Sequence, residues 1–552
     1  MRGKDLGQAL VQEGLISQEE LQKARQMQQN SHKSLEQILV DEGFINQKDL
    51  LRLLGALYGY ETIDLGGIAL DHHTVLKFPL QLLRKAKAIP FKEDGEYLHV
   101  ATADPFNYEA LEVMERIASK PLKIYLTLED DVEALFHRLS VLEDSKAIVE
   151  EVKQELEGAV QKPEGQSAVA KLIDLVLKDS IHRRATDIHL EPDEHKAMVR
   201  VRIDGVLYET FMFDKDVYNL LSSRIKLMGG LDISEKRKPQ DGRFSQKIDE
   251  KLYDFRLSTM PTIYGESLAM RVLDREKALM RLEELGFEQE NLERFKEMIR
   301  SPYGIVLITG PTGSGKTTTL YAALNEIKSI HNKVMTIEDP VEYRLPLVQQ
   351  MQVNEKAGLT FAVAARAFLR QDPDVMLIGE IRDYETLDAA SGASLTGHLV
   401  FTTLHTNDAV GAVTRLAQLG LKPHLIADAI IGIVAQRLVR KICPHCKIPH
   451  KISSDLEKKI EPYLSAQGRF YIGKGCPKCD FTGYYGRTMI SEVLEVDEEV
   501  ADLISKGASK FDIFKFATER KGFRPMISDG IKKALDGVTT VEEVLRVARD
   551  KR

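Results

Sequence analysis

The sequence predicts a multidomain α/β protein whose largest domain is a parallel sheet with helices on both faces. The chain has 552 residues, a length that corresponds to about three or four domains. After residue 304, strand-like apolar runs alternate with helical segments, which is typical of such sheets. The first of these runs, 304–309, leads into a glycine-rich turn at 310–317.

Composition and charge are those of an ordinary globular protein. Hydrophobic residues make up 43% and charged residues 29% of the chain, so several cores can be buried. The net charge of −8 argues against a nucleic-acid partner, which requires a basic surface. The sequence has no apolar run of about 18 residues, so no transmembrane helix is predicted. The first residues do not resemble a signal peptide. We therefore expect a cytoplasmic protein.

The first 145 residues are expected to form an N-terminal domain of two parts. The segments LGQALVQEGLISQEEL (6–21) and LEQILVDEGFINQKDL (35–50) agree at nine of sixteen positions. Each has an apolar helix stripe, a glycine stop and a new helix start, which predicts paired helical hairpins. From residue 60 to 145, strand-like and helical pieces alternate, which predicts a small α/β unit.

Residues 146–165 are expected to be a linker, because their last part is charged and ends in proline and glycine. A second α/β domain is expected at 166–285, with a helix at 169–182. Its candidate strands lie at 187–190, 197–203, 253–257 and 267–273. The largest domain occupies 286–552 and contains the glycine-rich turn.

The glycine-rich turn carries the strongest motif. GPTGSGKT (310–317) fits the phosphate-binding pattern G-x-x-x-x-G-K-[ST], between an apolar strand and a helix. Its backbone N–H groups can close around phosphates, and the helix N-terminus adds positive potential. Lys316 can reach the β- and γ-phosphates and Thr317 can ligate Mg²⁺, so we expect ATP and Mg²⁺ here. The expected nucleotide-binding residues are Gly310, Pro311, Thr312, Gly313, Ser314, Gly315, Lys316, Thr317 and Thr318.

A phosphate site also needs acids that hold the metal and orient water. MLIGE (376–380) is an apolar strand that ends in Glu380, the place of a Walker B acid, although Gly379 stands where aspartate is usual. TIEDPVEY (336–343) is a second strand that ends in acids, among them Glu342.

Two histidines flank the strand that should neighbour the P-loop strand. His398 precedes this strand and His405 follows it. On spacing alone a histidine is more often structural, but beside a nucleotide either side chain could contact the γ-phosphate. Both interpretations stay open at this stage.

The four cysteines form two C-x₂-C pairs within residues 440–487. Four thiolates suffice for a closed tetrahedral Zn²⁺ site, which would be structural because it has no open position. The 29 residues between the pairs exceed the spacing of a compact zinc ribbon, so the site would clip a longer insertion. Four ordinary cysteines and a redox pair are the alternatives. The candidate ligands are Cys443, Cys446, Cys476 and Cys479.

Together these motifs resemble those of the secretion ATPases that drive type II secretion and type IV pilus assembly. The resemblance covers about residues 166 to 500. Besides the P-loop, it rests on ATDIHLEP (185–192), FRLSTMP (255–261), GESLAMRVL (265–273), RQDPDVMLIGEIRD (370–383) and TGHLVFTTLHTND (396–408). It implies a RecA-like P-loop ATPase core with a zinc-binding insertion, preceded by a PAS-like α/β domain and an N-terminal helical plus α/β domain.

The resemblance also implies roles for single residues. Arg256 and Arg271 match arginines that the second domain brings to the γ-phosphate, where a guanidinium stabilises developing charge. Glu342 matches the general base and Glu380 the Walker B acid, and a glycine before that acid is usual in the family. Arginines that match phosphate or subunit contacts are Arg366, Arg370, Arg382, Arg415 and Arg487.

The N-terminal repeat resembles a cyclic di-GMP-binding module. Asp5 and Ser34 stand where that module has arginine, and Glu36 stands where it has glycine. An acid would repel a phosphodiester and the lost glycine would crowd its approach, so we expect no cyclic di-GMP binding. The module is instead expected to dock to a membrane-associated partner.

The predicted function is that of a hexameric, ATP-hydrolysing motor attached peripherally to the bacterial inner membrane. Its implied partners are an inner-membrane platform protein and a membrane-associated assembly protein with a cytoplasmic domain. Domain closure about a hinge at 275–286 would be the power stroke. The cysteine insertion favours type II secretion, and type IV pilus extension is the alternative. A non-hydrolysing nucleotide-dependent scaffold is a further alternative, which the acids and arginines oppose. A DNA-translocating relative is another, which the net charge opposes.

Overall fold

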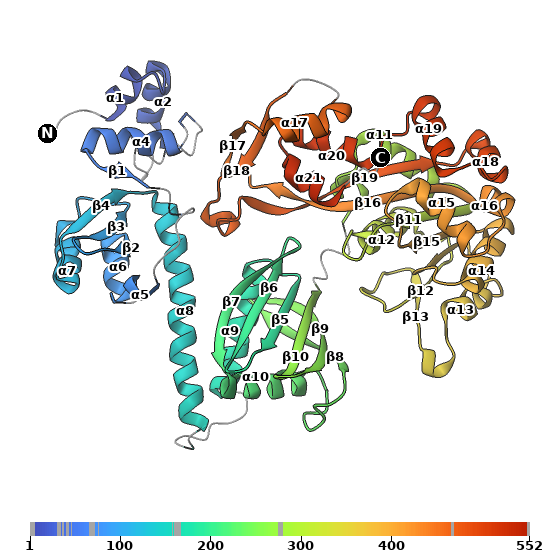
Figure 1. The fold of residues 1–552 in the computed structure, drawn as a ribbon, viewed down its shortest axis with the longest axis horizontal. Coiled ribbons are helices and arrows are strands. Elements are labelled where there is room, and N and C mark those ends of the chain that lie inside the picture. The colour runs from blue at the N-terminus through green and yellow to red at the C-terminus, as the bar shows by residue number, and fades with distance from the viewer. Residues whose placement is uncertain are drawn as a thin grey trace. The chain divides into compact units, whose positions relative to one another are not determined.

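The computed structural model describes residues 6–29, 35, 38–39, 44–45, 47–63, 65, 72–75, 77–156, 158, 167–273, 280–464 and 468–548 (Figure 1). The chain divides into two compact units with its main boundary between Glu151 and Val152, and each is described separately. The replaced module positions Asp5, Ser34 and Glu36 lie outside the described residues, as do residues 275–279 of the hinge expected at 275–286.

The N-terminal unit begins with short helices that share an apolar core. The described helices are α1 (Leu6–Gln12), α2 (Gln18–Gln29) and α4 (Gln47–Tyr58). Leu10, Leu21 and Leu39 are completely or almost completely buried where these segments meet. A capping box starts α2, because Ser17 Oγ accepts from the Glu20 N–H and Glu20 Oε2 accepts from the Ser17 N–H.

A four-stranded sheet of order β1-β4-β3-β2, with helices between its strands, follows in this unit. Its strands are β1 (Glu61–Thr62), β2 (Ala88–Glu93), β3 (Leu98–Thr102) and β4 (Leu122–Leu126). Its helices are α5 (His72–Val75), α6 (Leu80–Ala86), α7 (Tyr108–Ala118) and α8 (Glu129–Leu156). Helix α8 continues to Leu156, so the first part of the segment expected to be a linker is helical.

Residues 167–273 fold into an antiparallel sheet with two helices on one face. The strand order is β7-β6-β5-β10-β9-β8. The strands are β5 (Asp187–Pro192), β6 (Lys196–Ile203), β7 (Val206–Asp214), β8 (Gln240–Ile248), β9 (Lys251–Thr262) and β10 (Gly265–Leu273). Apolar side chains of α9 (Ala168–His182) and α10 (Lys215–Met228) surround Leu190 of β5 and Met270 of β10. Because strand side chains alternate, Arg271 points to the opposite face.

The C-terminal domain contains a seven-stranded sheet of order β13-β12-β14-β15-β11-β16-β19. All neighbours are parallel except β16 and β19, which confirms the predicted parallel sheet. Its strands are β11 (Gly304–Thr309), β12 (Val334–Glu338), β13 (Val348–Gln352), β14 (Val375–Ile378), β15 (Leu399–Leu404), β16 (Ile430–Ile442) and β19 (Tyr484–Glu495).

Helices cover both faces of this sheet. Because successive side chains of a strand point to opposite faces, they pack into two different cores. Val306 and Ile308 of β11 pack in one core with helices α11 (Gln289–Ile299) and α12 (Lys316–Ile327). Ile305 and Leu307 pack in the other core, with helices of the opposite face. These helices include α13 (Phe361–Phe368), α14 (Tyr384–Leu395), α15 (Ala409–Gln418) and α16 (Pro423–Ala429).

The remaining elements follow β16 and β19. The hairpin strands β17 (Lys447–His450) and β18 (Phe470–Gly473) enclose α17 (Ser454–Ile460). The chain ends in α18 (Glu498–Ser505), α19 (Lys510–Lys521), α20 (Met526–Leu535) and α21 (Val541–Val547). None of the helices in the described part of the chain has both the length and the apolar character needed to cross a bilayer.

The arginine-bearing domain 167–273 contains a buried ion pair that offers a stability test. Lys226 Nζ lies 2.8 Å from Glu266 Oε1, with side-chain exposures of 1% and 5%. Replacing Lys226 by Met leaves a buried carboxylate without its counter-ion, so we expect a loss of about 3–5 kcal/mol in the free energy of unfolding. Urea unfolding followed by circular dichroism measures this loss.

The double variant Lys226→Met/Glu266→Leu is the matched control, because it removes both charges. We expect it to recover most of the loss, since a well-packed apolar pair replaces a buried ion pair at little cost. Equal stabilities of the single variant and the wild type would contradict this account of the pair.

Candidate functional site

The nucleotide-site residues lie where parallel strands end. In the register of β11 and β15, Thr309 stands opposite Leu404, so the P-loop and the loop that carries His405 leave the sheet at the same edge. Strand β12 ends beside β14, with Ile337 opposite Ile378. The segments with Glu342 and Glu380 therefore leave by that edge as well, as in other open α/β sheets with ligand sites at the carboxyl ends.

The P-loop has the backbone conformation that its glycines allow. Gly310, Gly313 and Gly315 have φ values of +152°, +79° and +91°, in the region that disfavours other residues. A Cβ on Gly310 would lie 2.5 Å from Ser314 Oγ and 2.6 Å from Gln436 O. Helix α12 then starts at Lys316, and no side chain caps its first turn. The first N–H groups of the helix are therefore not used by a cap and suit a phosphate.

Lys316 is turned onto the loop itself. Its Nζ donates to the carbonyl oxygens of Gly310 at 2.8 Å and Pro311 at 3.2 Å. Burial lowers the pKa of Lys316, and the charge of Glu380 opposes that shift. Ser314 Oγ is buried and lacks a hydrogen-bond partner among the described residues. The loop thus has unsatisfied polar groups that fit a phosphate ligand.

Glu380 lies in a cluster of charged and titratable groups. It forms an ion pair with Arg382, and its Oε2 lies 3.5 Å from His405 Nε2. Burial and the charge of Lys316 lower the pKa of His405, while Glu380 opposes the shift. Lys316, Glu380 and His405 are therefore neighbours.

Glu342 is reached by an arginine of the preceding domain. Arg256 Nη2 donates to Glu342 Oε2 at 2.7 Å, and both side chains are partly exposed. Arg271 stands opposite Arg256 in the β9–β10 register, so the two predicted arginines share one face. Arg271 Nε donates to Asp187 Oδ1 at 3.1 Å. No pattern around Asp187 predicted that it would hold this arginine.

His398 does not lie with these residues. It precedes β15, and its backbone oxygen accepts from the N–H of Gly304 at the start of β11, the opposite edge of the sheet. Its Nδ1 lies 2.9 Å from Ala393 O at the end of α14. The expectation that either histidine could contact a γ-phosphate therefore fits the geometry of His405 and not that of His398, which has a structural contact.

The other predicted arginines occupy different places. Arg366 lies 3.9 Å from Glu385 on the helical face, and Arg370 donates to the carbonyl oxygen of Arg366. Arg415 lies in α15. Arg487 is on β19, where burial lowers its pKa and Asp204 and Asp187 oppose the shift. Of this group, Arg382 is the one that contacts Glu380.

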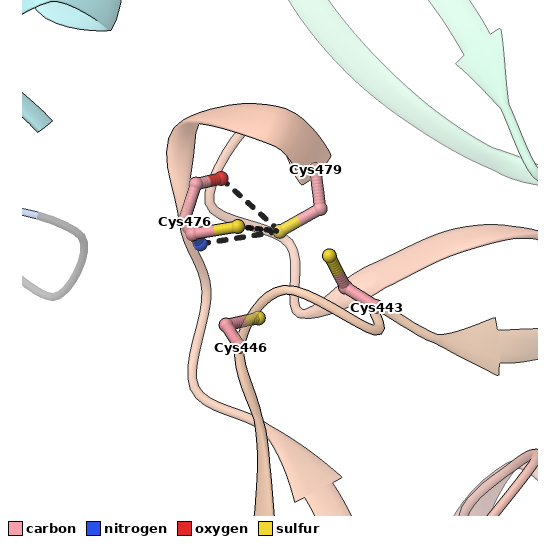
Figure 2. A group of neighbouring side chains, drawn as sticks. All are labelled: Cys443, Cys446, Cys476 and Cys479. Atoms are coloured by element: carbon pink, nitrogen blue, oxygen red, sulfur yellow. Dashed lines mark hydrogen bonds between the residues drawn. The ribbon is translucent and has the colours of Figure 1, made fainter. Parts of the chain in front are cut away.

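The four cysteines converge, as Figure 2 shows. Their Sγ atoms all lie within 4.8 Å of one another, and the Sγ atoms of Cys476 and Cys479 are 3.7 Å apart. Zinc–sulfur bonds of about 2.3 Å in a tetrahedron place sulfurs about 3.8 Å apart, so the cluster fits Zn²⁺. The long spacing is explained by β17, α17 and β18, which lie between the pairs. The predicted clustering, around a longer insertion, is confirmed.

Sequence reasoning missed Gln436 and Arg437 on β16. Gln436 Nε2 donates to Ser314 O at 2.8 Å, and Arg437 Nη2 donates to Asn407 O at 3.1 Å, two residues after His405. One signal was present: these polar residues interrupt the apolar run IIGIVA of a strand that is buried along most of its length. Such an interruption in a central strand indicates a specific polar partner.

The site combines a P-loop on a parallel sheet, a neighbouring strand that leads to a glutamate, and arginines of the preceding domain. This combination defines a class of ATPases. A family model described as type II/IV secretion system protein matches residues 162–546, and the model of the MshEN domain matches residues 58–146. The chain belongs to the type II/IV secretion system protein family and is an ATPase.

Relatives within the family serve two kinds of machine. The type IV pilus assembly ATPase PilB of Myxococcus xanthus is 38% identical over 98% of both chains. The type II secretion system ATPase E of Vibrio cholerae is 39% identical over 87% of this chain and 98% of its own. The structure of the Legionella pneumophila ATPase DotB shares the fold, with a TM-score of 0.52 at 21% identity over 68% of this chain and 95% of that chain.

The contact distances at Gly310 yield a direct test of the loop. We expect Gly310→Ala to weaken ATP binding by at least about tenfold, because backbone strain and steric overlap of this kind cost about 1–3 kcal/mol. Titration with a fluorescent ATP analogue measures the change. Gly397→Ala is the control: Gly397 also has positive φ, but its Cβ would meet nothing within 4 Å. Equal affinities of Gly310→Ala and the wild type would contradict the described loop geometry.

Proposed function

We propose that the protein is a ring-forming motor that couples ATP hydrolysis to a movement of residues 167–273 against the P-loop domain. The observation that carries this proposal is the Arg256–Glu342 contact, which joins the arginine-bearing sheet to the acid beside the P-loop. An arginine from a second domain supports hydrolysis only when that domain has closed, so chemistry and domain position become linked. By analogy with the family resemblance, the ring is a hexamer.

In this proposal each residue of the site has one task. The P-loop N–H groups and Lys316 bind the β- and γ-phosphates, and Thr317 would hold Mg²⁺ with Glu380 nearby. Glu342 orients the attacking water and accepts its proton. Arg256 and Arg271 stabilise the charge that develops on the γ-phosphate. His405 lies beside Glu380, where it would sense the phosphate through that acid.

The Arg256–Glu342 ion pair suggests how nucleotide changes the site. A partly exposed ion pair contributes about 1 kcal/mol or less, so a γ-phosphate can compete for the guanidinium. Transfer of Arg256 to the phosphate would release Glu342 to act on water. The second domain would follow its arginine, which is the closing step of the motor.

The machine that this motor drives adds pilin-like subunits to a filament. We propose that this machine is a type II secretion system. A type IV pilus is the second candidate, and the pilus assembly relative that aligns over 98% of both chains favours it. The partners would be an inner-membrane platform protein and an assembly protein bound by the N-terminal unit, at the bacterial inner membrane. We further propose that this unit does not bind cyclic di-GMP and that residues 167–273 form a PAS-like domain.

The cysteine cluster would hold one structural Zn²⁺ through Cys443, Cys446, Cys476 and Cys479. Bound zinc would supply four bonds that fix the ends of β16 and β19 to one another. Because all four positions are filled by protein, the site takes no part in hydrolysis.

The first prediction from the proposed function concerns the P-loop lysine. We expect Lys316→Ala to lower phosphate release by more than about a hundredfold, since it removes the cation that meets the β- and γ-phosphates. Circular dichroism should show an unchanged fold, because the hydrogen bonds of Lys316 Nζ go to carbonyl oxygens of the loop and not to a core element. Normal hydrolysis by this variant would overturn the site. Wild-type protein that binds ATP without hydrolysing it, alone or in the assembled ring, would favour a scaffold.

The second prediction concerns the metal. Metal analysis of protein purified without chelator should give one zinc per chain, and Cys476→Ser should lose most of it because a tetrahedral site needs all four thiolates. Lys478→Ser, between the cysteines of the second pair, is the control and should keep the metal. Wild-type protein without zinc, after growth with added zinc, would contradict the assignment.

A further inference from the structure

Strand β16 continues past the point where the P-loop strand ends. In the parallel β11–β16 pair, Thr309 stands opposite Ala435. Strand β11 stops there, whereas β16 runs on to Ile442 and remains paired with β19. On the side where β11 has ended, the residues just after Ala435 therefore lie against the glycine-rich turn, while on the other side they stay paired with β19.

Gln436 is the residue that contacts the turn, and both polar atoms of its side-chain amide are hydrogen-bonded. The residue is 1% exposed. Its Nε2 donates to Ser314 O at 2.8 Å, and its Oε1 accepts from Thr319 Oγ1 at 3.0 Å. A carbonyl oxygen can only accept, so the amide nitrogen must face Ser314, and the orientation of the side chain is fixed by its partners.

The two anchor points bracket the part of the loop that meets phosphate. Ser314 precedes Gly315, Lys316 and Thr317, and Thr319 follows them in the first turns of α12. The backbone of Gln436 is also close: its carbonyl oxygen would lie 2.6 Å from a Cβ on Gly310. The strand backbone thus approaches the start of the loop closely, and one amide is hydrogen-bonded to the loop on both sides of the phosphate-binding residues.

We propose that Gln436 is a positioning residue for ATP, which holds the P-loop in its phosphate-binding conformation. Gln436 does not touch the nucleotide itself; it acts through Ser314 and Thr319. Because it sets the positions of N–H groups that bind the phosphates before and during hydrolysis, its loss weakens ground state and transition state equally. Such a loss raises KM and leaves kcat nearly unchanged. This inference rests on the nucleotide site proposed above.

The variant Gln436→Met tests the inference, because it keeps the length of the side chain and removes both hydrogen bonds. Two buried polar groups then lack partners, and we expect KM for ATP to rise about tenfold with kcat within about twofold of the wild type. Steady-state phosphate release over a range of ATP concentrations measures both constants. An unchanged KM overturns the proposal, whether kcat stays the same or falls about tenfold.

A matched control separates positioning from general destabilisation. Asn291 is also a buried amide of this domain, but its Nδ2 lies 3.4 Å from Ser491 O, in the packing of α11 against β19. Asn291→Leu should lower the melting temperature as Gln436→Met does, with KM unchanged. A similar rise in KM in both variants would mean that KM reports stability, which would overturn the role assigned to Gln436.

A second variant keeps the test valid if Gln436→Met does not fold. Thr319→Val removes only the second anchor, so KM should rise by a few-fold, and no rise counts against the proposal. In the double variant the two effects should be less than additive, because the same contact is removed twice. If wild-type protein neither binds nor hydrolyses ATP, the nucleotide site itself is wrong. If it does both and KM is insensitive to these changes, only the role of Gln436 is wrong.

Discussion

The carboxyl ends of β11, β12, β14 and β15 lie at one edge of a parallel sheet, and the nucleotide site depends on that alignment. Each of these strands is buried along its whole length, so its register is fixed by packing on both faces. A shift of one residue in β15 would exchange its two buried faces and move His405 away from Glu380. The polar residues of four loops are thus positioned by apolar cores that have no chemistry of their own.

In the arginine-bearing domain, too, apolar packing positions the functional side chains, here in an antiparallel sheet. Helices α9 and α10 cover one face, and strand alternation leaves Arg256 and Arg271 on the other. The ion pair of Arg271 with Asp187 orients one guanidinium within the sheet, while Arg256 reaches Glu342 of the ATPase domain. One arginine is therefore held by its own domain and the other by Glu342 of the ATPase domain, an arrangement that suits the domain movement proposed above.

Two kinds of feature could be predicted from the sequence: contiguous motifs, and elements with a periodic hydrophobic pattern. The P-loop is contiguous, and its flanking strand and helix follow from hydrophobic patterning, so its place could be read directly. The cysteine pairs were recognisable because thiolates in C-x₂-C spacing have few other uses. Both histidines stayed open at that stage, although the direction of a parallel β15 places His405, which follows the strand, at the edge of the P-loop.

Contacts between distant segments were beyond prediction. Gln436 and Ser314 are far apart in the chain, and nothing near either residue specifies the other; only the extension of β16 beyond β11 brings them together. The same holds for Asp187 and Arg271, which face each other through the β5–β10 register. Helix α8 also continued where charge and glycine suggested a linker, because charged residues such as glutamate and lysine are good helix formers.

The central claim is that bound ATP draws the arginine-bearing domain toward the P-loop domain. Single-molecule energy transfer measures this most directly, with bio-orthogonal dyes at Leu252 on β9 and Tyr303 before β11, both of which are exposed. The account predicts that a non-hydrolysable ATP analogue shifts the distance distribution and that ADP restores it, with the shift lost in Arg256→Ala/Arg271→Ala. Identical distributions with and without an analogue that demonstrably binds would contradict the motor.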